Sequence, residues 1–179
     1  LVKKLKEVKG YERDYTYNHL LSEGYAKLGA HDKAYKALLK SLAVREVDID
    51  TTSFAEIEKT SPDFQEGLVS YLENELLLQG GSKAWSSIAE NELRHIIDYW
   101  WKSKKYSLLT ELCNLIVEYD ASFSNFEDYL FEFAYSFKET GEEEYAKHYY
   151  ELYIQKKGEN SSALNNLSII YEQMGNLKK

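Results

Sequence analysis

Two stretches of the chain, LFEFAYSFKETG at residues 130–141 and LNNLSIIYEQMG at residues 164–175, carry the same pattern 34 residues apart. The matching positions are Leu130 with Leu164, Phe133 with Leu167, Ala134 with Ser168, Phe137 with Tyr171, and Gly141 with Gly175. Their spacing places the apolar side chains on one face of a helix that ends near the glycine. A fixed period of this length indicates repeats that bury their apolar faces by stacking on neighbours.

The pattern continues after Gly141, where Ala146 and Tyr150 are four residues apart, as on a second helix that packs against the first. Together these positions resemble the tetratricopeptide repeat, a helical hairpin with this period. A third match surrounds Gly29, with Asn18 at the position of a large apolar residue; its other members are Leu21, Ser22, Tyr25, Ala34 and Leu38. A weaker match lacks the glycine and the small residues; it consists of Leu93, Ile96, Ile97, Trp100, Tyr106, Leu109 and Cys113.

The resemblance implies an all-α protein, a right-handed superhelical stack of antiparallel helix pairs. We expect about nine helices after an N-terminal helical fragment, in a single repeat domain that covers residues 1–179. Clear repeats are expected near residues 15–48 and 127–160 and a truncated one at 161–179, with degenerate helix pairs near 49–89 and 90–126. Since the last repeat still needs its second helix, we expect a fragment of a longer protein.

Two local expectations concern the Gly29 repeat. Gly24 lies inside the first helix, where glycine costs roughly 1 kcal/mol relative to alanine, so a close approach of another helix is expected there. Asp32 is expected to cap the second helix.

Composition limits the possible functions. Hydrophobic residues make up 44% of the chain and charged residues 29%, which excludes a disordered chain, and no apolar run is long enough for membrane insertion. The net charge of −8 argues against nucleic-acid binding and favours a basic or polar partner. Cys113, the single cysteine, falls in an apolar helical pattern, so we expect a buried thiol and a cytoplasmic protein.

The sequence contains no recognisable catalytic motif. The four histidines are scattered, and the nearest approach to a cluster is Glu144, His148 and Glu151, which share one helical face by spacing. Such triplets are common on surface helices. We therefore expect no enzymatic activity, no metal and no cofactor.

The resemblance implies a binding function, because the first helix of each pair lines a concave groove in this family. The groove positions would be His19, Glu23, Lys27, Arg94, Asp98, Trp101, Phe131, Tyr135, Lys138, Asn165, Ile169 and Glu172. The expected partner is a protein or peptide segment, with aromatic anchors such as Phe131, Tyr135 and Trp101. Alternatively, these are ordinary exposed residues, or the chain is a sensor or regulatory segment of a larger signalling or transcription regulator.

The truncated C-terminal repeat offers a second candidate surface. Without a following helix, apolar residues such as Ile170 and Met174 would be exposed and could support self-association.

Overall fold

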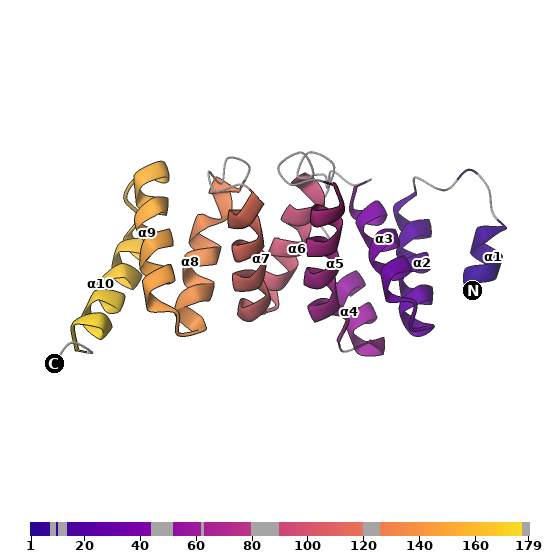
Figure 1. Ribbon diagram of the computed structural model, residues 1–179, viewed down its shortest axis with the longest axis horizontal. Coiled ribbons are helices and arrows are strands. Elements are labelled where there is room, and N and C mark those ends of the chain that lie inside the picture. Colours follow the sequence, from indigo (N-terminus) through magenta and orange to yellow (C-terminus); the bar gives the residue numbers. More distant parts are fainter. Residues whose placement is uncertain are drawn as a thin grey trace. The chain divides into compact units, whose positions relative to one another are not determined.

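The computed structural model describes residues 1–7, 10, 14–43, 52–61, 63–79, 90–119 and 126–176. In these residues every regular element is helical, which confirms the all-α class (Figure 1). The α-helices are α1 (Val2–Lys6), α2 (Tyr15–Lys27), α3 (His31–Leu42), α4 (Thr52–Thr60), α5 (Phe64–Gln79), α6 (Glu90–Lys102), α7 (Tyr106–Tyr119), α8 (Leu130–Glu139), α9 (Glu143–Lys157) and α10 (Ser161–Asn176). A 3-10 turn, η2 (Glu127–Tyr129), precedes α8. Among the described helices, none has the length and apolar character needed to span a bilayer.

The chain divides into two compact units, residues 1–99 (unit 1) and residues 100–179 (unit 2). In unit 1, α2 packs against α3 and α4, and α3 packs against α5. In unit 2, α8 packs against α7 and α9, and α9 packs against α10. Within each unit, helices therefore bury their apolar faces on helices that are near them in the sequence. The right-handed superhelix and the single repeat domain stay predictions.

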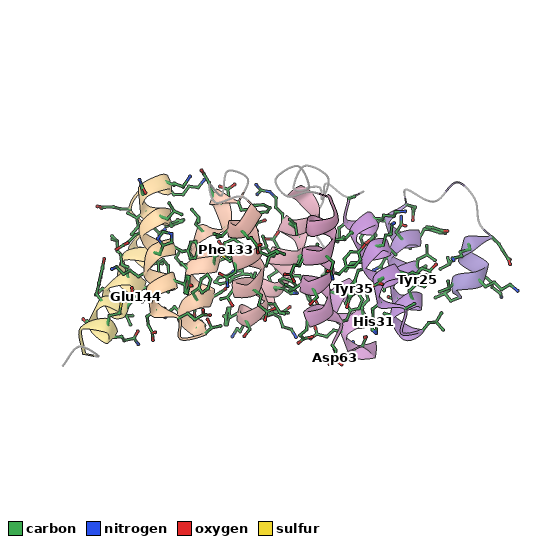
Figure 2. The ribbon with its side chains drawn as sticks, in the orientation of Figure 1. Tyr25, His31, Tyr35, Asp63, Phe133 and Glu144 are labelled. Atoms are coloured by element: carbon green, nitrogen blue, oxygen red, sulfur yellow. The ribbon has the colours of Figure 1, made fainter. Side chains whose placement is uncertain are left out.

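The ladder before Gly141 forms the core of unit 2, because Leu130, Phe133, Ala134 and Phe137 are fully buried. Phe133 lies in the interior of this unit in Figure 2. The members of the weaker ladder are also buried, apart from Tyr106, which is partly exposed. The apolar positions of both ladders were thus predicted correctly, with Tyr106 as the exception.

The small residues of the Gly29 repeat let two helices approach closely. The Ser22 hydroxyl group donates a hydrogen bond of 2.9 Å to the carbonyl oxygen of Ala34, which joins α2 to α3. Asn18, at the position of a large apolar residue, is buried and donates to the carbonyl oxygen of Asp14 at 2.9 Å. The intrahelical bond offsets the cost of burying this amide.

The ladder on α10 is oriented differently from the one on α8. Leu164 and Tyr171 are 41% and 48% exposed, while Ala163 and Ile170 are fully buried. The expectation that Ile170 would be exposed is therefore wrong, because α10 uses this neighbouring face to pack against α9. In the repeat pattern, Leu164 and Tyr171 belong to the face that packs on a following helix. The described residues contain no such helix.

Three hairpins close with the same backbone turn. The amide of Ala30 donates to the carbonyl of Tyr25 at 3.0 Å, that of Glu142 to Phe137 at 2.8 Å, and that of Lys105 to Trp100 at 2.8 Å. The residue before each donor is left-handed: Gly29 has φ of 68°, Gly141 has 81°, and Lys104 has 56°. The weaker hairpin therefore makes the same turn without the glycine that defines it in the sequence.

The two local expectations had different outcomes. A Cβ atom on Gly24 would lie 2.5 Å from Cγ2 of Val2, so α1 approaches α2 closely at this glycine, as predicted. Asp32 does not cap α3, because the short turn after Gly29 lets the helix begin at His31. Its carboxylate lies in the first turn instead, where the helix dipole favours a negative charge.

The left-handed conformation of Lys104 leads to a stability prediction. A non-glycine residue pays a steric cost of about 1 kcal/mol or more in this region, and glycine does not. We expect Lys104→Gly to raise the free energy of unfolding by about 1 kcal/mol, measured by urea denaturation followed by circular dichroism. The matched change Gly141→Ala should lower it by about the same amount. A lower stability of Lys104→Gly would contradict this account of the turn.

Candidate functional site

The chemically reactive side chains of the described residues are dispersed. Within these residues, no three His, Cys, Asp or Glu side chains are grouped in a way that could hold a metal ion. In the predicted triplet, Glu151 accepts a hydrogen bond of 2.5 Å from the Tyr171 hydroxyl, and the exposed His148 ring contacts Tyr149. Glu144 lies exposed on α9 (Figure 2). Two members of the triplet therefore make contacts typical of helix surfaces.

Cys113 lies on α7 and is fully buried, as predicted. Burial raises the pKa of its thiol from about 9 to about 12, against a smaller lowering by the hydroxyl of Tyr149. Because the thiolate is the nucleophilic form of cysteine, this environment makes the side chain inert at neutral pH.

The predicted groove residues of unit 1 lie on two helices. On α2, His19 and Glu23 are part-buried and joined by a hydrogen bond of 2.9 Å, and the Tyr15 ring stacks on His19 with 5.8 Å between centroids. Lys27 is exposed at the end of this helix. The other two residues, Arg94 and Asp98, are part-buried on α6. A shared groove for these five residues stays a prediction.

In unit 2, Trp101, Tyr106 and Tyr135 form an aromatic cluster. The Trp101 ring meets Tyr135 edge-on at 5.3 Å between centroids, and Tyr106 lies 6.0 Å from Trp101 and 5.6 Å from Tyr135. All three residues are partly exposed. The Lys138 amine lies 5.2 Å from the centroid of the Tyr135 ring and 3.5 Å from the Glu139 carboxylate. The structure thus brings together three predicted groove residues, Trp101, Tyr135 and Lys138.

Tyr106 is a member of the cluster that the sequence pattern placed among the packing positions. It is the first residue of α7, just after the turn that follows Trp101, and a first-turn aromatic next to a hairpin is the signal that could have identified it. The Tyr135 hydroxyl has a raised pKa because of burial and, to a smaller extent, because of the nearby Glu139 carboxylate.

The remaining predicted groove residues of unit 2 have other surroundings. Phe131 meets the rings of Tyr150 and Tyr153 edge-on, at 5.6 and 5.7 Å between centroids, so its ring is in contact with α9. The three residues on α10 are exposed: Asn165, Ile169 and Glu172. The role of Phe131 as an anchor stays a prediction.

Unit 1 contains a cleft that the sequence did not predict, between α3 and α5, with a volume of about 660 Å³ (the α3–α5 cleft). Its lining residues are His31, Asp32, Lys33, Tyr35, Lys36, Asp63, Gly67, Ser70, Tyr71 and Asn74. Figure 2 shows His31 and Tyr35 on α3, with Asp63 at the start of α5. Both helices are second members of their predicted pairs, whereas the family resemblance directed attention to the first helices.

The base of the α3–α5 cleft is held by the contact between Tyr35 and Gly67. Tyr35 is 4% exposed and lies between Phe64 and Tyr71, with ring centroids 4.6 and 5.3 Å away. Burial raises the pKa of the Tyr35 hydroxyl to about 12, assisted by the Asp32 and Glu66 carboxylates. A Cβ atom on Gly67 would lie 2.1 Å from this hydroxyl, so any larger residue here would force Tyr35 to shift.

Comparison with protein-family models gave no match, and comparison with curated proteins gave none either. The tetratricopeptide resemblance therefore rests on the sequence ladders and remains a prediction.

The Tyr35–Gly67 contact predicts the effect of a single methyl group. Gly67→Ala should lower the free energy of unfolding by about 1–2 kcal/mol in urea denaturation, because steric overlap outweighs the gain of about 1 kcal/mol in helix propensity. In the Tyr35→Phe background the loss should fall by at least half, since the nearest remaining ring atom is 3.2 Å from the added methyl group.

The matched control is Gly175→Ala on α10, where the added Cβ atom would meet nothing within 4 Å. This change should leave stability unchanged or raise it by up to about 1 kcal/mol. If Gly67→Ala behaved like Gly175→Ala, the packing of Tyr35 against α5 would be refuted.

The buried thiol predicts slow chemical modification. At pH 8 the raised pKa of Cys113 lowers the thiolate fraction about a thousandfold relative to an ordinary thiol, and burial hinders access further. We expect a disulfide reagent such as DTNB to label the native protein only as fast as it unfolds, and the guanidinium-unfolded protein at once. Labelling of the native protein within seconds would contradict the position of Cys113.

Proposed function

We propose that this chain is a binding module of the tetratricopeptide type, and that a segment of a partner protein lies across the aromatic cluster of unit 2. The observation that carries the proposal is the cluster itself: three aromatic rings, partly exposed and in mutual contact. Two of them, Trp101 and Tyr135, are on helices that the repeat pattern assigns to partner binding. The sequence ladders support the type of module.

Mutual packing makes these rings suitable as anchors. Each ring is held by the other two, so little side-chain entropy remains to be lost on binding. Tyrosine and tryptophan are also enriched among residues that dominate binding energies, because they combine a large apolar area with a polar group. In free solution such a cluster leaves apolar area in contact with water, and a partner segment would cover it.

Lys138 and Glu139 give the cluster a polar rim. The Lys138 amine contacts both the Tyr135 ring and the Glu139 carboxylate, so positive and negative charge lie beside the rings. A rim of this kind adds little affinity but selects the orientation of a bound segment. The fitting partner is therefore a peptide with an apolar or aromatic side chain next to polar groups.

The proposal is tested with peptides selected from a random library on the immobilised protein and then measured by fluorescence anisotropy. Trp101→Ala and Tyr135→Ala should each weaken binding at least about tenfold, as expected for residues that anchor a ligand. Tyr135→Phe should retain most of the affinity, because the ring makes the contact. Circular dichroism should remain that of the wild type.

Tyr145→Ala is the matched control, since Tyr145 is 53% exposed on α9 and outside the cluster. Its effect on binding should be less than about twofold. Selected peptides that bind Trp101→Ala and Tyr135→Ala as tightly as the wild type would refute the assignment of the cluster.

A further inference from the structure

The solvent-facing side of α3 carries Lys33, Lys36 and Lys40, which we call the lysine ridge. All three are exposed, and none has an ion pair with any residue that the structure describes. They are three and four residues apart, so they follow one side of the helix over about 10 Å. Because no ion pair with a described residue neutralises them, the three neighbouring ammonium groups carry positive charge along this side of α3.

A groove of about 190 Å³ runs beside the lysine ridge, between α2 and α3 (the α2–α3 groove). Among the residues that the structure describes, its lining consists of the three lysines together with Asn18, Leu21, Tyr25 and Ala37, and none of these is acidic. Leu21 and Ala37 are buried and form an apolar floor, while Tyr25 is partly exposed. The groove thus combines an apolar floor with a basic edge.

A fourth cation lies next to this groove. The Lys6 amine of α1 is 5.5 Å from the centroid of the Tyr25 ring. The main cause of its raised pKa is a hydrogen bond with the Tyr25 hydroxyl. Tyr25, which is labelled on α2 in Figure 2, itself lines the groove. The added charge extends the basic edge toward α1.

The other side of the ridge has a different character. Lys33 and Lys36 also line the α3–α5 cleft, whose lining includes the carboxylates of Asp32 and Asp63. Carboxylates in that cleft would repel an anionic ligand, whereas the described lining of the α2–α3 groove carries none. The observations therefore favour the α2 side of the ridge for a negatively charged ligand.

The distribution of charge along the chain agrees with this choice. Residues 1–43 hold nine of the 22 basic residues and five of the 30 acidic ones, a net charge of +4, whereas residues 44–179 have a net charge of −12. The basic character is therefore local to the segment that builds the groove. An anionic ligand would be steered there and repelled by most of the remaining chain.

We propose that the α2–α3 groove binds an acidic, amphipathic segment of a partner protein, with glutamate or aspartate side chains on the lysine ridge and an apolar side chain on the floor formed by Leu21 and Ala37. The small volume has room for one or two apolar side chains. The apolar floor distinguishes this ligand from a nucleic acid, whose phosphates would use the lysines alone. This surface does not depend on the aromatic cluster of unit 2.

The test uses a short fluorescein-labelled peptide in which glutamates and leucines follow helical spacing, and fluorescence anisotropy at low salt. Lys33→Gln/Lys36→Gln/Lys40→Gln should weaken binding at least about tenfold, because three ionic contacts are lost together. The control Lys102→Gln/Lys104→Gln/Lys157→Gln removes the same charge from exposed positions of unit 2 and should change binding less than about twofold.

Two altered peptides separate the contributions of the groove. Replacing the glutamates by glutamines should abolish the difference between the wild type and the ridge variant. Replacing the leucines by serines should weaken binding to the wild type, since the floor would lose its ligand. Serine peptides that bind as tightly as leucine peptides, or equal losses in both lysine variants, would overturn the proposal.

Competition experiments address the other possible occupants. Double-stranded DNA and phosphatidylserine vesicles should displace the peptide poorly at physiological salt. Tighter binding of either one at the ridge would replace the acidic segment with a polyanion or a membrane surface. Sedimentation equilibrium should show no dimer that depends on the three lysines; such a dimer would identify a second copy of the chain as the occupant and overturn the proposal.

Discussion

The backbone hydrogen bond that closes three of the helical hairpins determines which side chains meet at the surface beside them. In the α6–α7 hairpin the Lys105 amide reaches back to the Trp100 carbonyl, and the chain reverses within a few residues. Trp101 and Tyr106 lie on either side of this turn, and their ring centroids are therefore only 6.0 Å apart. Tyr135 of α8 completes the group. The aromatic cluster is thus a consequence of a short turn next to a packed helix.

The same kind of turn, at Gly29, determines where α3 begins and how close it lies to α2. Because Gly29 adopts a left-handed conformation and the Ala30 amide bonds to Tyr25, α3 begins at once and lies antiparallel and close to α2. The Ser22 hydroxyl joins the two helices at a position where a larger side chain would separate them. Close approach leaves a shallow groove, and the lysines on the outer side of α3 become its edge.

Much of the fold could be predicted from the sequence, because helical periodicity reports directly which face of a helix is buried. Phe133 and Phe137 are core residues for this reason, and so are Ile97 and Trp100 in the weaker ladder. The turn at Lys104 could not be predicted in this way. Its left-handed conformation, with φ of 56°, contradicts the local preference of lysine.

The surroundings of some candidate site residues could not be predicted from the sequence either. The family pattern assigns residues to faces of a helix but does not say which neighbour occupies each face. Leu164 and Tyr171 carry the ladder and yet are exposed, since no described helix covers them. Phe131 was expected to face a partner, but the large rings of Tyr150 and Tyr153 reach it from α9. Such outcomes depend on the size of side chains on another helix, which spacing alone does not contain.

The net charge of the whole chain does not describe the local charge that a ligand meets at the groove. The overall value of −8 favours a basic or polar partner, but charges in physiological salt are screened over about 8 Å. A ligand in the α2–α3 groove therefore responds mainly to the groups that line it, namely Lys33, Lys36 and Lys40. The acidic residues elsewhere in the chain act at longer range, and their repulsion grows with the length and charge of a polyanion. A short acidic segment avoids most of this repulsion, so a basic groove and an acidic chain are physically compatible.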